Sequence, residues 1–402
     1  MNSPLKMLID GAIGAALFVA LLLVFGLELL IGLMSGGTGK NTLEGVRPVL
    51  VERSHGSKKL KLGVTETGQQ PNPSTGELEK YDDMGKLLKE LGSGYKFDEL
   101  KIADLVANPK KIYEYEVVFL TCHTGHEEQL RETLRNYVME GGILYGSDLR
   151  YNAIAKAFPE EVAKHLEGQG HPQILDADIV DPGLREYLTA DPELAKHLHA
   201  GKLRLKFDLG EWRPAAFDSP RTKVLLKGNY KKLTRKGQPD QGSAVAPLMV
   251  KFQIGKGTVI FTSFHNEKQN SEIEKKLLQY LVFSLVTAGV DAELNAKLEK
   301  GGFAAQRSSL LSAPSRNQKI TKEYKNERVA DLQFALGFRE DSGAKLKFKI
   351  ISPDGKHYTW EGTSTVILEV PGAQAGLWRY EVIAEDLPDP NFPFIVTVGE
   401  KK

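Results

Sequence analysis

The chain has 402 residues, which is enough for two or three domains. Its 53 lysines and arginines balance 52 aspartates and glutamates, so no overall charge attracts nucleic acid, and we expect no nucleic-acid partner. The single cysteine excludes an intramolecular disulfide and a zinc site of the CxxC type.

A long apolar segment lies near the amino terminus. Residues 12–34, AIGAALFVALLLVFGLELLIGLM, form a nearly continuous apolar run of 23 residues, and a membrane-spanning helix needs about 20. A cleavable signal peptide is the alternative, but the run is long for one and no A-x-A-like cleavage site follows it. We therefore expect a single-pass membrane anchor after a short flank at 1–11. Glu28 inside the run either contacts another membrane protein or reaches toward the interface.

Basic residues beside this run leave its orientation open. Lys6 precedes the run, whereas Lys40, Arg47 and Arg53 follow it, and this count alone would place the following domains in the cytoplasm. Large domains are translocated regardless of so small a bias. The low cysteine count and the terminal β-domain described below favour a position outside the cytoplasm. We expect the soluble part to be extracytoplasmic, at the cell membrane.

After a polar stalk at 35–57, the segment 58–290 alternates strands with helices. Its clearest unit is Glu116–Arg150, with a buried strand at Val117–Leu120, a polar loop, a helix at 126–140 and a second strand at Ile143–Tyr145. Parallel strands of such a unit deliver the polar residues after them to one edge of the sheet, where ligands of open α/β sheets bind.

The same alternation continues on both sides of this unit. Further strands are predicted at 59–65, 95–102, 223–226, 247–252 and 258–261, and helices at 84–92, 151–166 and 271–288. The stretch 168–220 follows no clear period and is interpreted as an insertion. The pattern predicts an α/β doubly wound, mostly parallel sheet of the flavodoxin-like kind.

The last part of the chain differs in kind. After a linker at 291–325, residues 326–402 form six or seven short segments of alternating apolar and polar residues, several of them separated by turns. No helical pattern interrupts them. This predicts a C-terminal all-β sandwich of immunoglobulin-like type.

Two segments carry a resemblance to a known family. They are YEYEVVFLT…LRETLRNYVMEGGILYGSD and KGTVIFTSFHNE. They resemble the strand–helix–strand unit before the nucleophile elbow, and the late strand with its His and Glu, of the class I glutamine amidotransferase-like superfamily. The resemblance covers roughly 58–290 and is closest to the non-amidotransferase, ThuA-like branch.

The resemblance implies which residues would form the active site. True amidotransferases have G-x-C-x-G at the elbow, and here Asp148 stands in place of the cysteine and Arg150 in place of the second glycine. His265 and Glu267 match the family's base and its orienting carboxylate, with Asn266 in place of a proline. A histidine–carboxylate pair without a nucleophile cannot perform thiol acyl transfer. The resemblance therefore argues against glutamine hydrolysis.

Two other side chains could replace the missing nucleophile. Cys122 follows the neighbouring strand and could act with His265 and Glu267, or it could be a small buried filler, as free cysteines commonly are. Ser147 precedes the elbow position, and an activated serine needs a base within hydrogen-bond reach.

A metal site is the other candidate. His123, His126 and Glu127 form, together with Asp148, His265 and Glu267, the densest set of ligand-type side chains in the chain. The H-x-x-H spacing does not match the helical i, i+4 pair of zinc peptidases, so the two rings need not converge. No phosphate-binding loop or dinucleotide fingerprint occurs, and we expect no organic cofactor.

These features predict a membrane-anchored, catalytically inactive binding or assembly protein, a pseudoenzyme that acts with other proteins of a membrane-associated bacterial envelope complex. The alternative is a membrane-tethered hydrolase that uses His265 and Glu267 with Asp148, Cys122 or a metal.

Overall fold

The computed structural model describes residues 42–51, 60–71, 75–92, 95–164, 168–189, 196, 198, 200–234, 238, 240–269 and 272–402. The predicted membrane span at 12–34, its flank at 1–11 and Glu28 lie outside the described residues. Across the described ranges, no helix is both long and apolar enough to cross a membrane.

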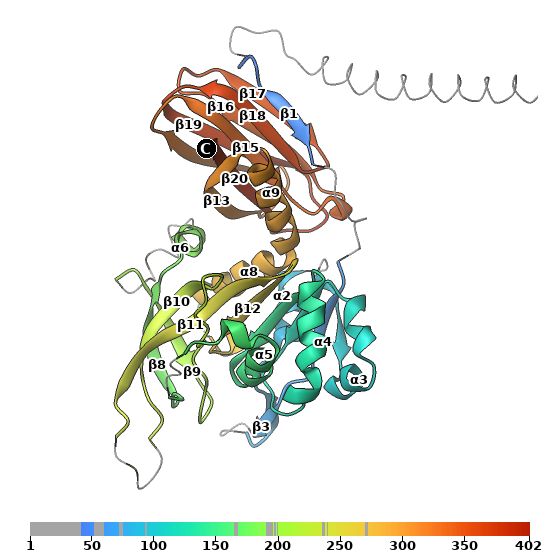
Figure 1. Cartoon of the computed structure of the whole chain (residues 1–402), viewed down its shortest axis with the longest axis vertical. Helices are drawn as coiled ribbons and strands as arrows, with labels where there is room; N and C mark the ends of the chain where they lie inside the picture. Colours follow the sequence, from blue (N-terminus) through green and yellow to red (C-terminus); the bar gives the residue numbers. More distant parts are fainter. Residues whose placement is uncertain are drawn as a thin grey trace, which may run out of the picture.

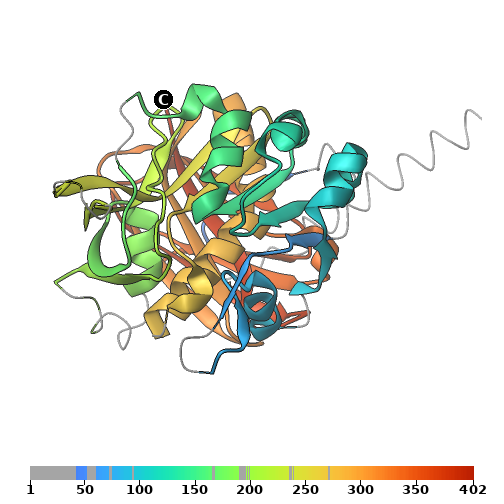
Figure 2. The same ribbon diagram turned by 90° about the horizontal axis from the view of Figure 1, so that it is seen from below.

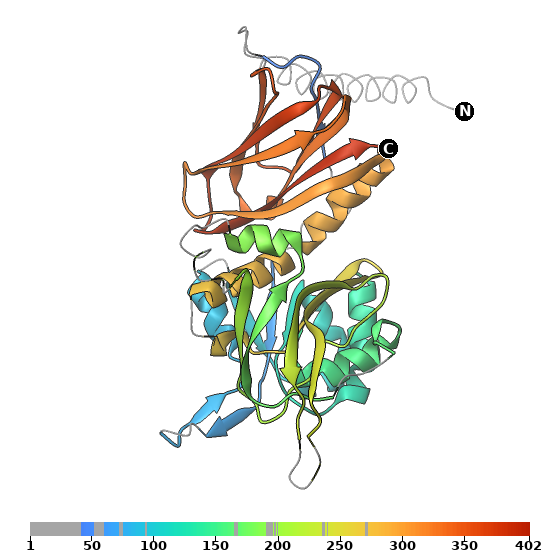
Figure 3. The ribbon, with the colours of Figure 1, turned by 90° about the vertical axis from the view of Figure 1, so that its left-hand side faces the viewer.

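The described chain forms an α/β domain and a β-sandwich, which follow one another along the long axis of the molecule (Figures 1 and 3). The α/β domain is built on a nine-stranded sheet. The strands of this sheet, in spatial order, are β5 (Phe97–Leu100), β2 (Leu62–Thr65), β6 (Val117–Leu120), β7 (Ile143–Ser147), β12 (Gly257–Thr262), β11 (Ser243–Ile254), β10 (Lys223–Lys231), β8 (Gln173–Ile179) and β9 (Lys202–Phe207). A separate small hairpin joins β3 (Gln69–Pro71) to β4 (Leu78–Lys80).

The sheet has a parallel half and an antiparallel half. Strands β5, β2, β6, β7 and β12 pair in parallel, and numbering these five along the chain gives the order 2-1-3-4-5 of flavodoxin-like sheets. Strands β11, β10, β8 and β9 extend the sheet by antiparallel pairing. The prediction of a mostly parallel sheet is therefore corrected, because the stretch interpreted as an insertion contributes two strands to the antiparallel half.

Helices cover both faces of the sheet (Figure 2). One layer contains α3 (Ile102–Ala107), α4 (Glu127–Met139) and α5 (Tyr151–Ala157), and the other contains α2 (Met84–Leu91), α6 (Pro182–Thr189) and α8 (Glu272–Val286). Side chains of β6 alternate between the two cores, with Phe119 on the α2 and α8 side and Leu120 on the α4 side. Short 3₁₀ helices are η2 (Pro109–Glu114), η3 (Asp148–Arg150), η4 (Pro159–Glu161) and η5 (Asn266–Lys268).

Local sequence explains where two of these helices begin or end. Asp83 is the N-cap of α2, and its carboxylate accepts the Lys86 backbone N–H at 3.1 Å. The helix predicted at 151–166 ends at Ala157, because Pro159 disfavours helical backbone in the residue before it and has no N–H to continue the helix.

The C-terminal domain is a sandwich of two antiparallel sheets, as predicted, and its immunoglobulin-like type stays a prediction. One sheet contains, in spatial order, β1 (Arg47–Leu50), β18 (Val366–Ala373), β15 (Ala330–Gly337), β20 (Phe392–Lys401) and β13 (Phe303–Ala313). The other contains β14 (Lys319–Asn326), β19 (Gly376–Asp386), β16 (Lys345–Ile351) and β17 (His357–Gly362). Their inner faces share one apolar core, and η6 (Glu340–Ser342) joins two of the strands.

Two domain boundaries differ from those predicted. The expected linker at 291–325 instead contains most of α9 (Ala288–Lys300) and the strands β13 and β14. The expected stalk at 35–57 contains β1, which pairs with β18 at the edge of the sandwich. The chain thus contributes a strand to the sandwich, builds the α/β domain, and then returns to complete the sandwich.

Charged side chains join the two domains. Arg339 of the sandwich lies 2.7 Å from both carboxylate oxygens of Glu116, which precedes β6. Glu186 of α6 pairs with Arg307 at 2.8 Å and with Lys322 at 2.9 Å. The α/β domain and the sandwich therefore share a polar interface.

Candidate functional site

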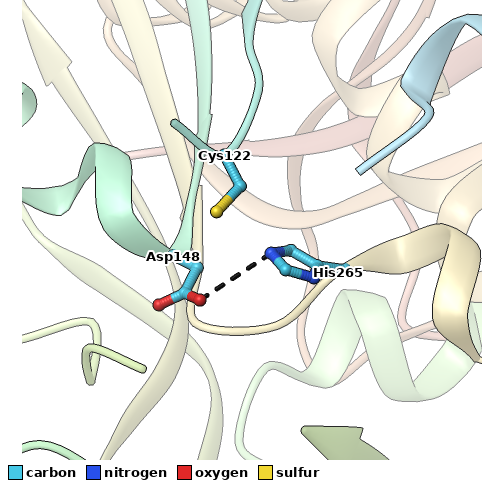
Figure 4. Close-up of side chains that lie close together, drawn as sticks. All are labelled: Cys122, Asp148 and His265. Carbon is cyan, nitrogen blue, oxygen red and sulfur yellow. Dashed lines mark ion pairs between the residues drawn. The ribbon is translucent and has the colours of Figure 1, made fainter. Parts of the chain in front are cut away.

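Three of the predicted site residues come together at one edge of the parallel half-sheet (Figure 4). Cys122 follows β6, Asp148 follows β7, and His265 follows β12. These three strands are neighbours and parallel, so their carboxyl ends meet at the same edge. The resemblance placed His265 and Asp148 at this edge, and Cys122 joins them from the adjacent strand.

The three side chains form a compact buried cluster. One ligand atom from each of Cys122, Asp148 and His265 lies within 4.8 Å of the others. The Nε2 atom of His265 lies 3.7 Å from an Asp148 carboxylate oxygen. Their exposed fractions are 0%, 1% and 1% in that order, so the cluster is sealed from solvent.

Asp148 keeps the backbone geometry of a strained elbow. Its φ is +41°, a region that non-glycine residues rarely occupy, and it stands at the turn from β7 into η3 and α5. One carboxylate oxygen accepts the Arg213 backbone N–H at 2.9 Å. The structure thus has a sharp strand-to-helix turn at which Asp148 carries a carboxylate.

Asp208 supplies the carboxylate that orients the His265 ring. Its Oδ1 atom lies 3.0 Å from His265 Nδ1, and it follows β9 in the antiparallel half of the sheet. The side chain of Glu267, which the resemblance assigned to this role, lies outside the described part of the structure. Sequence reasoning missed Asp208 because β9 was not recognised. Its signal was a polar residue directly after the alternating run LRLKF.

Asp82 is a second buried carboxylate that sequence reasoning missed. Its Oδ2 atom accepts the Ser147 hydroxyl at 2.5 Å and the Cys122 backbone N–H at 3.3 Å. Its neighbour Asp83, and not Asp82, is the N-cap of α2. Ser147 was a candidate nucleophile, and its hydroxyl instead donates a hydrogen bond to Asp82.

Arg150 holds the loop after β6 against the elbow. Its Nε donates to the Thr121 carbonyl at 3.1 Å and its Nη1 to the Gly125 carbonyl at 3.2 Å. Burial lowers the pKa of this guanidinium to about 10, which leaves it charged at neutral pH. Arg150 thus ties the loop after β6 to the turn after β7.

The buried groups shift one another's pKa values. Burial raises the pKa of Asp148 to about 7 and also raises that of the Cys122 thiol. Burial alone would lower the pKa of His265, but its hydrogen bond to Asp208 and the adjacent Cys122 raise it well above its ordinary value. For Asp208, the effect of His265 exceeds that of burial and lowers the pKa. The pKa values of His265 and Asp208 thus depend on charged neighbours within the same buried cluster.

Several buried polar atoms around the cluster have no hydrogen-bond partner among the described residues. They are His265 Nε2, Asp82 Oδ1, Asp208 Oδ2 and Arg150 Nη2. Buried polar groups normally find a partner, and an unpaired one marks a site of chemistry, an ordered water or an ion.

The other metal-ligand candidates lie apart from this cluster. The cluster of ligand-type side chains found in the described ranges contains neither His123 nor His126. The His123 ring contacts the Thr124 carbonyl, and His126 is the exposed N-cap of α4 with φ +61°. Glu127 accepts the Gly125 backbone N–H at 2.7 Å. These residues shape the loop before α4.

No family model matches the chain, and no curated protein matches its sequence. Among solved structures, a ThuA-like protein from Bacteroides uniformis is 16% identical with a TM-score of 0.37, over 60% of this chain and 98% of that one. A cytoplasmic protein from Salmonella typhimurium is 12% identical with a TM-score of 0.35, over 56% and 98%. A beta-galactosidase from Bacillus circulans is 11% identical with a TM-score of 0.29, over 77% of this chain and 41% of that one. A ThuA-like protein is thus among the structural neighbours, and no conclusion about activity follows from TM-scores below 0.5.

Proposed function

We propose that this protein is a membrane-anchored, catalytically inactive binding or assembly protein that works by recognising a protein or ligand in a bacterial envelope complex. The observation that carries the proposal is the state of the elbow. Asp148 stands where an amidotransferase needs its thiol, its carboxylate is engaged by Arg213, and it is 1% exposed. A nucleophile must be activated and must reach its substrate. The burial of Asp148 argues against access to a substrate, and its hydrogen bond to Arg213 argues against its activation.

The only thiol supports the same conclusion. Cys122 is 0% exposed, and burial raises the pKa of its thiol. The thiolate is the reactive form of cysteine, and catalytic cysteines have a lowered pKa and partial exposure. Cys122 has the opposite properties.

The anchoring part of the proposal comes from the sequence. The apolar run at 12–34 provides the single-pass anchor, and Glu28 within it is the contact to a membrane partner. The low cysteine count and the terminal sandwich favour an extracytoplasmic position. The sandwich, of immunoglobulin-like type, would provide a second recognition surface that the Arg339–Glu116 pair fixes to the α/β domain.

The test uses the full chain, tagged and extracted from its native membrane in detergent. We expect no release of ammonia from glutamine above that of buffer. We also expect a co-purifying membrane protein that is retained by Asp148→Asn and lost with Glu28→Leu. Val24→Leu within the same run is the matched control and should keep the partner. Amide hydrolysis by the wild type that disappears in His265→Gln would contradict the proposal.

One observation favours a second candidate, a membrane-tethered hydrolase in which Asp148 is the nucleophile. Asp148 has the strained φ of an elbow residue, and His265 lies between it and Asp208. A carboxylate nucleophile, a base and an orienting carboxylate are the parts of a covalent hydrolase. A carboxylate nucleophile displaces the leaving group of an alkyl halide or opens an epoxide, and water then attacks the carbonyl carbon of the resulting Asp148 alkyl ester. During turnover of a panel of such substrates in ¹⁸O-labelled water, this function therefore requires the label to enter the Asp148 carboxylate. An unlabelled Asp148 peptide after exposure to the panel rejects it.

A further inference from the structure

We propose that Cys122, Asp148 and His265 bind a divalent transition metal ion, for which zinc fits the three ligand types best. The inference goes beyond the proposed function, because it assigns a ligand to the sealed elbow whatever the anchor and its partners are.

The distances suit ligands of a common ion better than a hydrogen bond. The His265 Nε2 and Asp148 Oδ2 atoms are 3.7 Å apart, which exceeds the N–H···O range that ends near 3.2 Å. Zinc bonds to nitrogen and oxygen of about 2.0 to 2.2 Å, in a tetrahedral arrangement, place two such ligand atoms about 3.4 Å apart. The third ligand atom, from Cys122, completes a group within 4.8 Å. The three ligand atoms are therefore close enough together to share a single ion.

The unpaired ring nitrogen of His265 is an independent observation that points to an ion. His265 is 1% exposed, and its Nε2 atom faces Asp148 and Cys122 without a hydrogen-bond partner among the described residues (Figure 4). Its other nitrogen is held by Asp208 at 3.0 Å. Histidines that bind metals almost always give their second ring nitrogen to a carboxylate, a carbonyl or water. Asp208 is therefore the positioning residue of the proposed site.

The charges and the ligand types select the class of ion. A thiolate and a carboxylate together neutralise a divalent cation, which removes the penalty of burying unpaired charges. Thiolate and imidazole ligands favour zinc and similar transition ions, whereas magnesium and calcium prefer oxygen ligands. Three protein ligands leave a fourth position of a tetrahedral ion for an oxygen atom.

The burial of the cluster predicts how the ion exchanges. All three ligand residues are at most 1% exposed, and Arg150 ties the loop after β6 to the elbow. An ion held there enters as the chain folds or when this loop opens. We therefore expect a chelator to remove it slowly from the folded protein and quickly in denaturant.

The test uses the full chain, solubilised in detergent and produced in cells supplied with cobalt in place of zinc. Cobalt alone is the probe, because cobalt bound to a thiolate gives a charge-transfer absorption band in the near ultraviolet. We expect one cobalt ion per chain and this band. Cys122→Ser should abolish the band, while Asp148→Asn and His265→Gln should lose the stoichiometric ion. Asp208→Asn, which keeps all three ligands, should weaken metal affinity by about 10- to 100-fold.

Matched controls separate this site from adventitious binding. His357→Gln in β17 and Asp176→Asn in β8 change the same residue types away from the cluster and should keep one ion and the band. Circular dichroism identifies variants that fail to fold. If a ligand variant fails to fold, the metal affinity of Asp208→Asn, which keeps all three ligands, tests the proposal in its place. The proposal is overturned if the wild type holds no stoichiometric cobalt. It is equally overturned if the ion and band persist unchanged in Cys122→Ser and in Asp208→Asn.

Discussion

His265 and Asp208 form a buried imidazole–carboxylate pair across 57 positions of sequence, with Nδ1 and Oδ1 3.0 Å apart. The pair joins the parallel half of the sheet, which ends in β12, to the antiparallel half, which ends in β9. It fixes the plane of the ring, so that Nε2 faces Asp148 and Cys122. The direction in which His265 Nε2 points depends on this contact.

Replacing Asp208 with asparagine should lower the pKa of His265. Burial lowers this pKa, and the hydrogen bond to Asp208 is the largest influence that raises it. Titration of the His265 ring protons by NMR, with a chelator present, measures the change. Asp176→Asn, which breaks an exposed pair with Arg204, is the control and should leave His265 unaffected. An unchanged His265 pKa in Asp208→Asn would show that the pair does not act as described.

Asp148 should make the protein less stable as the pH rises from 3.8 to about 7. The unfolded carboxyl ionises at its ordinary value of 3.8, whereas burial keeps the native one protonated up to about 7. The native state therefore binds more protons in this window, and its stability falls by up to about 1.4 kcal/mol per pH unit from this group. Asp148→Asn should remove that part of the slope. Urea unfolding of the wild type and of Asp148→Asn at pH 5 and pH 8, with a chelator present, measures how the free energy of unfolding changes with pH. The same change in both proteins would contradict the raised pKa of Asp148.

Arg339→Met should destabilise the protein by about 3 kcal/mol, because it leaves Glu116 and Asp341 without their buried cation. The Arg339 side chain is 8% exposed, so water screens these contacts only weakly. Arg316→Met removes an exposed pair with Asp386 and should cost under about 1 kcal/mol. Chemical denaturation of both variants gives the comparison. Similar losses in the two would mean that the contact between the domains contributes little.

Glu186→Gln should weaken the interface at neutral pH and have less effect in acid. Burial raises the pKa of Glu186, but Lys322 and Arg307 lower it more, so it lies below the ordinary 4.5. A carboxyl whose pKa is lower in the native state than in the unfolded state stabilises the native state at pH values above its unfolded-state pKa. This stabilisation is lost as the pH falls through its native-state pKa. Unfolding at pH 7 and pH 3 measures the difference between variant and wild type. A difference that does not shrink toward pH 3 would contradict the assignment.

The parallel half of the fold follows from sequence because its signals are local. Val117–Leu120 is a continuous apolar run, and the helix after it repeats apolar residues at helical spacing, so both were predicted close to their observed limits. Asp148 and His265 were placed at one edge because parallel strands end there.

The rest depends on contacts between distant residues. Strand β13 has Ser309 at a buried position where an alternating pattern would show an apolar side chain, and its ten pairs with β20 become evident only in three dimensions. Asp208 was missed because the stretch containing β9 was interpreted as an insertion, so the carboxylate after its alternating run was not recognised as a residue at a strand end. Asp82 was missed because an acidic residue just before a helix is common, and its contacts with Ser147 and Cys122 come from strands distant in the sequence.

The reactivity of Cys122 tests most directly the claim that this site is sealed and lacks a catalytic thiol. Because the chain has one cysteine, reaction with a chromogenic aromatic disulfide reports on this residue alone. As a positive control, Met139→Cys in a Cys122→Ser background places a thiol on the exposed side of α4, where Met139 is 42% exposed, and should react at once. For the folded wild-type chain, we predict no reaction on the timescale of that control, and complete reaction in denaturant. Rapid, stoichiometric reaction of the folded wild type would contradict the account.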